Sequence, residues 1–177
     1  MRTKVAEVKK RLTQANITIN QSKSVEVAEV LDWLGYEISK EGLKPSSSKS
    51  EKIRGLKAPR SAKELRQLLG IVNYYMKYIP RMAMLAEPLH ALLKKGRSWR
   101  WGPAQQKGLD QIKREIGRDE TLAPFETNGK VRTYLTTDAS ENGIGAVLEQ
   151  EQANGEIKPV VYWSSKLRSY EKNYSIS

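Results

Sequence analysis

The hydrophobic pattern of residues 1–43 predicts one helix followed by short strands. Valine and leucine recur at three- and four-residue spacing within residues 2–15, which is typical of an amphipathic helix. The next apolar stretches are short and rich in β-branched residues, which favours hairpin strands over a helix. The predicted strands cover residues 17–20, 25–30 and 34–39. Residues 42–48, GLKPSSS, combine glycine, proline and serine, so we place a domain boundary there.

Three helices are predicted in the middle of the chain. Ser61 and Glu64 form a capping-box pattern, in which side chains of the first turn bond its free backbone N–H groups. The helix that follows has a core stripe at helical spacing, and Pro80 ends it. This stripe consists of Leu65, Leu68, Leu69, Val72, Met76 and Ile79. A second helix over roughly residues 82–94 and a third that begins at Pro103 repeat the spacing.

From residue 119 onward the pattern changes to short strands. Alternating apolar and polar positions predict strands over residues 131–138, 145–150 and 160–165, with turn residues between them. A further helix is expected to begin within residues 169–177. Helices in the middle of the chain and strands on either side predict an α+β fold.

Charge is distributed unevenly along the chain. Residues 1–118 hold 25 Lys and Arg against 11 Asp and Glu, a balance of +14. Residues 119–177 hold 6 against 9, a balance of −3, so the net charge is +11. A basic body joined to a mildly acidic end suggests that the body binds a polyanion such as nucleic acid. The alternative is a lysine-rich surface that is merely solvated.

The polar face of the helix after Ser61 is the candidate contact for that polyanion. It carries Lys63, Arg66, Gly70, Asn73 and Lys77. These side chains can meet a phosphate backbone, and the glycine would allow it to approach closely. A solvated polar face explains the spacing equally well.

Composition excludes several kinds of chemistry. The chain has no cysteine, which excludes disulfides, thiolate metal sites and a cysteine nucleophile. Its single histidine, His90, has no serine or aspartate placed in a recognisable pattern nearby, which argues against serine–histidine catalysis. No apolar run approaches the ~18 residues that span a bilayer, and there is no signal-peptide pattern. Trp99 and Trp101 can stack on bases, but we favour a role in anchoring helices to the core.

Asp138, at the end of the first predicted strand after residue 119, is the candidate metal ligand. A carboxylate at the C-terminal end of a central strand can hold Mg²⁺ beside a scissile phosphate. Metal-assisted phosphodiester hydrolysis needs several carboxylates from different elements, so Asp138 alone is not sufficient. Without further context it can equally be a turn-capping residue.

The sequence around Asp138 resembles a known family. Residues 137–150, TDASENGIGAVLEQ, and residues 159–175, PVVYWSSKLRSYEKNYS, closely resemble the start of the RNase H domain of gypsy-class LTR retrotransposon Pol polyproteins. Residues 34–45, LGYEISKEGLKP, resemble the segment after the polymerase active site in the same polyproteins, including the primer-grip hairpin. Residues 63–80 resemble their thumb. The resemblance is collinear and covers essentially the whole chain.

The resemblance implies three parts. Residues 1–43 would be the C-terminal end of the reverse transcriptase palm with the primer-grip hairpin, residues 44–118 the thumb and connecting helix, and residues 119–177 a truncated RNase H-like domain. The expected α+β fold is therefore a palm-end β-hairpin remnant, a basic helical thumb and an incomplete RNase H-like sheet of three strands. Such a sheet keeps an unpaired edge, so residues 119–177 are expected to be the least stable part.

The resemblance also implies roles for single residues. Asp138 matches the first RNase H metal ligand, whereas Glu171 does not match the catalytic glutamate, which the family places further along. The polymerase carboxylates of the family would precede Met1. The resemblance assigns the primer end to Leu34, Gly35 and Tyr36, and the template–primer backbone to Lys63, Arg66, Gly70, Asn73 and Lys77.

The implied enzyme makes DNA on an RNA template and cleaves the RNA strand of RNA–DNA hybrids with Mg²⁺. Its implied partners are RNA–DNA hybrid, template–primer duplex and the rest of the Pol polyprotein, with no membrane. It would act in the cytoplasm, within the virus-like particle of the parent element, or in the nucleus. The chain itself is expected to bind duplex without turnover. The alternative is a non-catalytic nucleic-acid-binding module, either a host-retained remnant or a connection-like RNase H fold.

Overall fold

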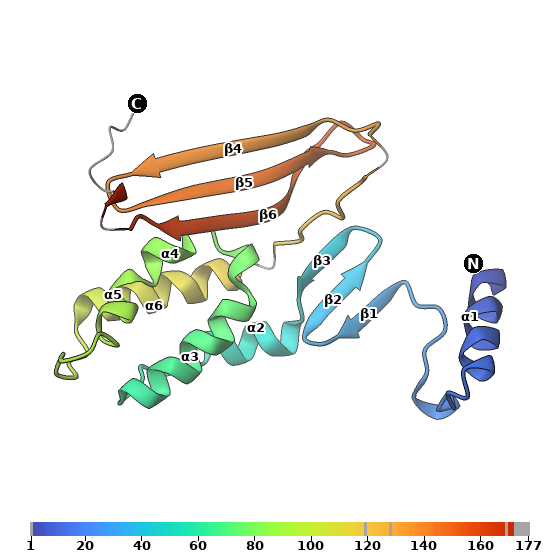
Figure 1. The fold of residues 1–177 in the computed structure, drawn as a ribbon, viewed down its shortest axis with the longest axis horizontal. Helices are drawn as coiled ribbons and strands as arrows, with labels where there is room; N and C mark the ends of the chain where they lie inside the picture. Colours follow the sequence, from blue (N-terminus) through green and yellow to red (C-terminus); the bar gives the residue numbers. More distant parts are fainter. Residues whose placement is uncertain (1, 119, 128, 169, 172–177) are drawn as a thin grey trace.

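The computed structural model describes residues 2–118, 120–127, 129–168 and 170–171. It contains two three-stranded antiparallel sheets, of strand order β1-β2-β3 and β4-β5-β6, with helices between them, and so confirms the α+β fold. Figure 1 shows helices α2 to α6 in one layer, with sheet β4-β5-β6 along one side, sheet β1-β2-β3 at one end and α1 beyond it. Among the described residues, no helix is long and apolar enough to span a membrane.

The N-terminal part differs from the prediction after its first helix. The predicted helix is α1, Arg2–Gln14, but residues 17–20 and 25–29 form no strand. Ile17, Val25 and Val27 each keep more than half of their surface exposed. The strands lie later, at β1 Val30–Trp33, β2 Tyr36–Ser39 and β3 Gly42–Pro45, and a short 3₁₀ turn, η1, covers Gln21–Lys23.

The β1–β2 connection is a tight turn formed by Leu34 and Gly35. Both residues have positive φ, 51° and 84° respectively, as a two-residue hairpin turn of matching twist requires. Strand β3 spans the predicted domain boundary between residues 43 and 44, because its residues complete the ladder with β2. Leu43 and Leu122 also exchange backbone hydrogen bonds of 2.9 and 2.8 Å, which tie this sheet to the segment before β4.

The helical layer follows the predicted periodicity with three changes. Helix α2, Ser47–Arg54, begins in the serine-rich stretch where we placed a domain boundary. Helix α3, Ala62–Tyr74, ends before Pro80, and a 3₁₀ turn, η2, covers Met76–Tyr78. The predicted helix over 82–94 is two short helices, α4 Met82–Leu85 and α5 Glu87–Ala91. Pro88 accounts for this break, because it has no N–H to continue the hydrogen-bond ladder of α4.

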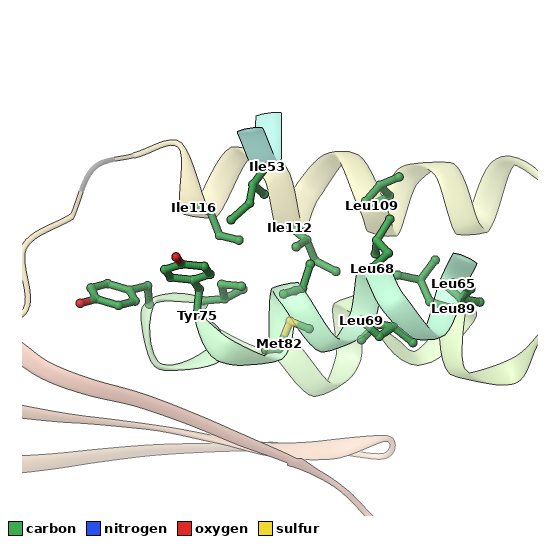
Figure 2. Close-up of a cluster of buried hydrophobic side chains, with 14 of the residues drawn as sticks. Ile53, Leu65, Leu68, Leu69, Tyr75, Met82, Leu89, Leu109, Ile112 and Ile116 are labelled. Atoms are coloured by element: carbon green, nitrogen blue, oxygen red, sulfur yellow. The ribbon is translucent and has the colours of Figure 1, made fainter. Parts of the chain in front are cut away.

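The core is built where the predicted stripes meet. Figure 2 shows side chains of α2, α3, α4, α5 and α6 pointing toward one another, among them Leu65, Leu109 and Ile112, which are fully buried. Helix α6, Pro103–Ile116, begins at the predicted proline. Trp99 and Trp101 are partly buried and pack against this core, which confirms their anchoring role.

The C-terminal sheet contains the three predicted strands, β4 Thr133–Ser140, β5 Gly143–Glu151 and β6 Ile157–Lys166. It joins the helices through β6: the N–H of Ala83 donates to Ser164 Oγ at 2.9 Å, and Lys166 pairs with Glu87 at 2.6 Å. All residues of β4 are exposed, and within the described ranges no strand pairs with its outer edge. The helix expected within residues 169–177 falls largely on residues 169 and 172–177, which lie outside the described residues.

Candidate nucleic-acid interface

The exposed face of α3 presents four of its five predicted contact residues together. Lys63, Arg66, Gly70 and Asn73 are all exposed along the helix. The helix starts as the capping pattern predicts: Ser61 Oγ accepts the N–H of Glu64 at 3.2 Å, and Glu64 Oε2 accepts the N–H of Arg60 at 2.8 Å.

Two properties leave the α3 face open to a ligand. Lys63 and Arg66 form no ion pair with any residue that the structure describes, so their charges are available. A Cβ atom built on Gly70 would meet nothing within 4 Å. Positive charge beside open space matches the requirement for contact with a phosphate backbone.

Lys77 lies beyond the end of α3, so the predicted helix face does not extend to it, and its contact with nucleic acid stays a prediction. Because α3 ends at Tyr74, Lys77 lies in η2, and its side chain no longer follows the spacing of the α3 face. Its ammonium sits over two aromatic rings, 4.4 Å from the Tyr36 centroid and 5.4 Å from the Tyr78 centroid. Burial lowers the pKa of Lys77, since it disfavours the charged form. Lys77 therefore makes cation–π contacts where the β1–β2 hairpin packs against the end of the helix.

The predicted primer-end residues lie at the C-terminal end of the same helix. Gly35 and Tyr36 are buried at the β1–β2 turn, whereas Leu34 projects with 65% of its surface exposed. The N–H of Ser46, just before α2, donates to the carbonyl of Gly35 at 3.0 Å.

Three tyrosine hydroxyls fasten this turn to α3. Tyr74 donates to the carbonyl of Leu34 at 2.8 Å, and Tyr75 to that of Gly35 at 3.3 Å. In return, Tyr36 donates to the carbonyl of Tyr74 at 2.7 Å, and their rings stack with centroids 5.0 Å apart. Burial raises the pKa of Tyr36 and of Tyr75, so both hydroxyls stay protonated donors. The turn and the end of α3 therefore form one unit.

Asp138 lies in β4, opposite Gly145 of β5, and faces the helical layer rather than other carboxylates. The guanidinium of Arg81 donates to Asp138 Oδ2 at 2.6 Å, and both side chains are more than half exposed. Arg81 has a φ of 54°, a left-handed conformation that is uncommon for a residue with a Cβ. The pair borders a hollow of about 140 Å³ that Thr136 and Trp163 also line.

A catalytic metal site is not assembled around Asp138 in the described part of the chain. No group of three or more histidine, aspartate or glutamate side chains there could hold a metal ion. The described residues thus do not fit the divalent metal that the family resemblance implies, because one carboxylate held by an arginine is not a metal cage.

The sequence reasoning missed Arg81, Tyr74 and Tyr75 as site residues. Arg81 and Asp138 are 57 positions apart, and each tyrosine is 40 positions from the carbonyl that it bonds. No local pattern connects residues at such separations. The one signal was that Tyr74 and Tyr75 lie within residues 63–80, which resemble a thumb, whereas Arg81 follows directly after that stretch.

Comparisons with known proteins give one consistent result. Residues 101–177 match the family model of the RNase H-like domain found in reverse transcriptase. The chain is 38% identical, over 173 residues, to the transposon Tf2-3 and Tf2-4 polyproteins of Schizosaccharomyces pombe. That alignment covers 98% of this chain and 13% of each polyprotein, so the chain spans about an eighth of their length.

Solved structures show the same fold at lower sequence identity. The foamy viral protease-reverse transcriptase dRH in complex with double-stranded DNA superimposes with a TM-score of 0.78 at 21% identity, covering 99% of this chain and 31% of that one. The foamy viral protease-reverse transcriptase in complex with RNA/DNA hybrid gives 0.76 at 19% identity, covering 99% and 24%.

Proposed function

Because residues 101–177 belong to the RNase H-like domain family found in reverse transcriptase and the chain is related to retrotransposon polyproteins, we propose that it binds RNA–DNA hybrid and template–primer duplex. The observation that carries this proposal is the open cationic face of α3, where Lys63 and Arg66 have no ion pair within the described residues. The relatives in solved structures, which carry double-stranded DNA or RNA/DNA hybrid, give it further support.

The dimensions of the α3 face suit a duplex backbone. Lys63 and Asn73 are ten residues apart on one helix, which corresponds to about 15 Å at ~1.5 Å per residue. That length spans roughly four base pairs of one strand at ~3.4 Å per pair. Contacts of this kind reach phosphates rather than base edges, so the chain would bind with little sequence preference.

In the whole polyprotein, the proposed activities are RNA-templated DNA synthesis and Mg²⁺-dependent cleavage of the RNA strand of hybrids. Its proposed site of action is the cytoplasm, within a virus-like particle, or the nucleus. For the chain by itself we propose binding without turnover, because Asp138 is paired with Arg81 and no second carboxylate joins it in the described ranges.

The test of this proposal combines binding with turnover. The 177-residue chain is titrated against a fluorescent RNA–DNA hybrid at low salt and then assayed for nuclease and polymerase activity with Mg²⁺ and with Mn²⁺. We expect binding and no turnover. Turnover that an Asp138→Asn variant abolishes would refute the proposed inactivity, and absence of hybrid binding at low salt would refute the proposed function.

A non-catalytic nucleic-acid-binding module is the second candidate. The Arg81–Asp138 ion pair favours it, because it gives Asp138 a structural partner in place of a metal ion. The two candidates differ in the reading frame that surrounds the gene segment. A frame with an upstream Asp-Asp pair and downstream acidic ligands supports the enzyme, and a frame without either supports the module.

A further inference from the structure

A hollow of about 570 Å³ lies between α6 and the start of α4. Its walls are one stripe of α6 on one side and residues of α4 and its N-terminal flank on the other. The lining includes Gln111, Arg114, Glu115 and Arg118 on the first side and Arg81 and Leu85 on the second. The volume falls within the range of small-ligand sites, roughly 300–1,000 Å³. We call it the arginine hollow, after its three arginines.

Helix geometry explains why these side chains of α6 gather. Positions 111, 114, 115 and 118 follow the i, i+3, i+4, i+7 spacing of a single helix face. The N–H of Arg118 donates to the carbonyl of Glu115 at 3.2 Å, which continues this face past the end of α6. Ile112 and Ile116 point into the core instead (Figure 2), so the polar stripe lies beside the buried one.

The charge of the arginine hollow favours an anion. Its lining holds three guanidinium groups and one carboxylate, a balance of +2. Glu115 pairs with Arg118 at 2.8 Å, whereas Arg114 forms no ion pair with any described residue. A guanidinium presents its N–H donors in a planar fork that matches the oxygens of a phosphate group. Phosphate is therefore the anion that this lining complements best.

Arg81 connects the arginine hollow with Asp138. It also lines the smaller hollow of about 140 Å³ beside β4, where its guanidinium donates to Asp138 at 2.6 Å. The stem of Arg81 crosses β5, because a Cβ added to Gly145 would lie 3.8 Å from its Cγ atom. The side chains of Arg81 and Asp138 are 64% and 60% exposed, and ion pairs in such positions are weak. An anion in the arginine hollow can therefore compete with Asp138 for the same guanidinium.

We propose that the arginine hollow binds a small phosphate anion between Arg114 and Arg118, and that Arg81 turns from Asp138 to this anion when it binds. The phosphate is either a free inorganic anion or part of a nucleotide. Occupancy of the hollow and the Arg81–Asp138 ion pair then oppose each other, and by linkage each weakens the other to the same extent. The inference is independent of duplex binding through α3, because no residue of α3 lines this hollow.

The first experiment measures binding of two matched probes. Pyrophosphate and adenosine diphosphate are each titrated into the 177-residue chain by calorimetry without divalent metal. We expect both to bind, and Arg114→Gln/Arg118→Gln should weaken binding about tenfold or more, because it removes two charge-assisted contacts. Tighter binding of adenosine diphosphate supports a nucleotide as the ligand, and equal or weaker binding supports the free anion.

A matched control separates the hollow from the overall charge of the chain. Arg97→Gln/Arg100→Gln removes the same charge from the exposed segment before α6 and should keep the affinity of wild type. Absence of binding by both probes, or an equal loss in this control, overturns the proposal. A chain that binds hybrid but neither probe refutes this inference and leaves duplex binding intact.

The second experiment tests the exchange of Arg81 between its two partners. Asp138→Asn removes the competing carboxylate and should tighten pyrophosphate binding about threefold. Glu141→Gln, which removes the same charge from the exposed β4–β5 turn, should not. In an Arg81→Gln background, Asp138→Asn should have no effect, since the shared guanidinium is gone. All substituted side chains are exposed, so the variants should fold like wild type. Tightening that persists without Arg81, or that equals the effect of Glu141→Gln, contradicts the exchange.

Discussion

Two glycines in similar helices should respond in opposite directions to the same substitution. In a helix interior, Gly→Ala stabilises by about 0.8–1.0 kcal/mol, because alanine loses less backbone freedom on folding. Gly70 of α3 has no heavy atom within 4 Å of the added Cβ, so Gly70→Ala should gain this amount. At Gly108 of α6, the Cβ would lie 2.6 Å from the carbonyl oxygen of Leu85. Real Cβ atoms do not approach backbone so closely, and α4 and α6 must separate.

The magnitude for Gly108→Ala follows from the two opposing effects. Forcing a methyl group into a packed contact costs about 1–3 kcal/mol. The helical gain offsets about 1 kcal/mol of this, so the net loss is roughly 0–2 kcal/mol. Gly70→Ala and Gly108→Ala should therefore differ by about 1–3 kcal/mol, although both add a single methyl group.

The assay is urea unfolding followed by far-UV circular dichroism, with thermal unfolding as a second measurement. A difference of ~1 kcal/mol corresponds to about 2–4 °C for a chain of this size. Hybrid binding should fall in Gly70→Ala despite its higher stability, because the methyl group keeps a phosphate backbone from approaching α3. Equal stability of the two variants would show that α4 and α6 do not pack as described.

Three further predictions concern pH, local stability and the Asp138 pair. Burial raises the pKa of Tyr36, Tyr78 and Tyr162 above the ordinary value near 10. The stability that these buried tyrosines contribute is thus complete below about pH 10 and is lost as the pH rises further. The urea midpoint should fall between pH 9 and pH 11, and it should fall less in Tyr162→Phe than in wild type. Backbone amides of β4 should exchange faster with deuterium than those of α3 and α6, since β4 is exposed throughout, and equal protection would contradict this. Arg81→Gln should change the free energy of unfolding by less than about 1 kcal/mol, because both partners of its ion pair are largely exposed, and a larger loss would show that the pair is a structural fastener.

The helical layer was predictable because its periodicity reflects the core directly. The stripe from Leu65 to Val72 and the start of α6 at Pro103 are as the spacing indicates, since burial selects those positions. The same reasoning failed for residues 17–20 and 25–29, where Ile17, Val25 and Val27 keep more than half of their surface exposed and no described strand offers them a partner surface. Strand propensity without such a surface does not make a strand.

Serine and proline residues lie at the starts of two helices that the sequence pattern did not predict. Ser46 directly precedes α2 without a side-chain capping hydrogen bond, and Ser50 is buried within the helix, so the serine-rich segment that we took for a domain boundary leads into a helix. Pro88 starts α5 and so divides a leucine pattern that looked continuous. Serine and proline are both common at the start of a helix, so the same residue types can mark a loop or the beginning of a helix.

The candidate site was predictable only where one segment contains it. The α3 face and the Leu34–Gly35–Tyr36 turn each lie within a single run of sequence. Other features of the site depend on tertiary contacts. These are the packing of Lys77 over the Tyr36 ring, the hydrogen bonds from tyrosines to the turn, and the Arg81–Asp138 ion pair. Such contacts are set by how elements pack, which one sequence does not specify locally.

The most direct test of duplex binding through α3 is the salt dependence of affinity. For duplex DNA, the slope of log K against log salt is about −0.9 for each phosphate contact. Lys63→Ala/Arg66→Ala should therefore reduce the magnitude of the slope by about 1.8, whereas Lys94→Ala/Lys95→Ala, of equal charge change, should leave it unaltered. Identical slopes in wild type and in Lys63→Ala/Arg66→Ala would contradict the assignment of the α3 face as the nucleic-acid interface.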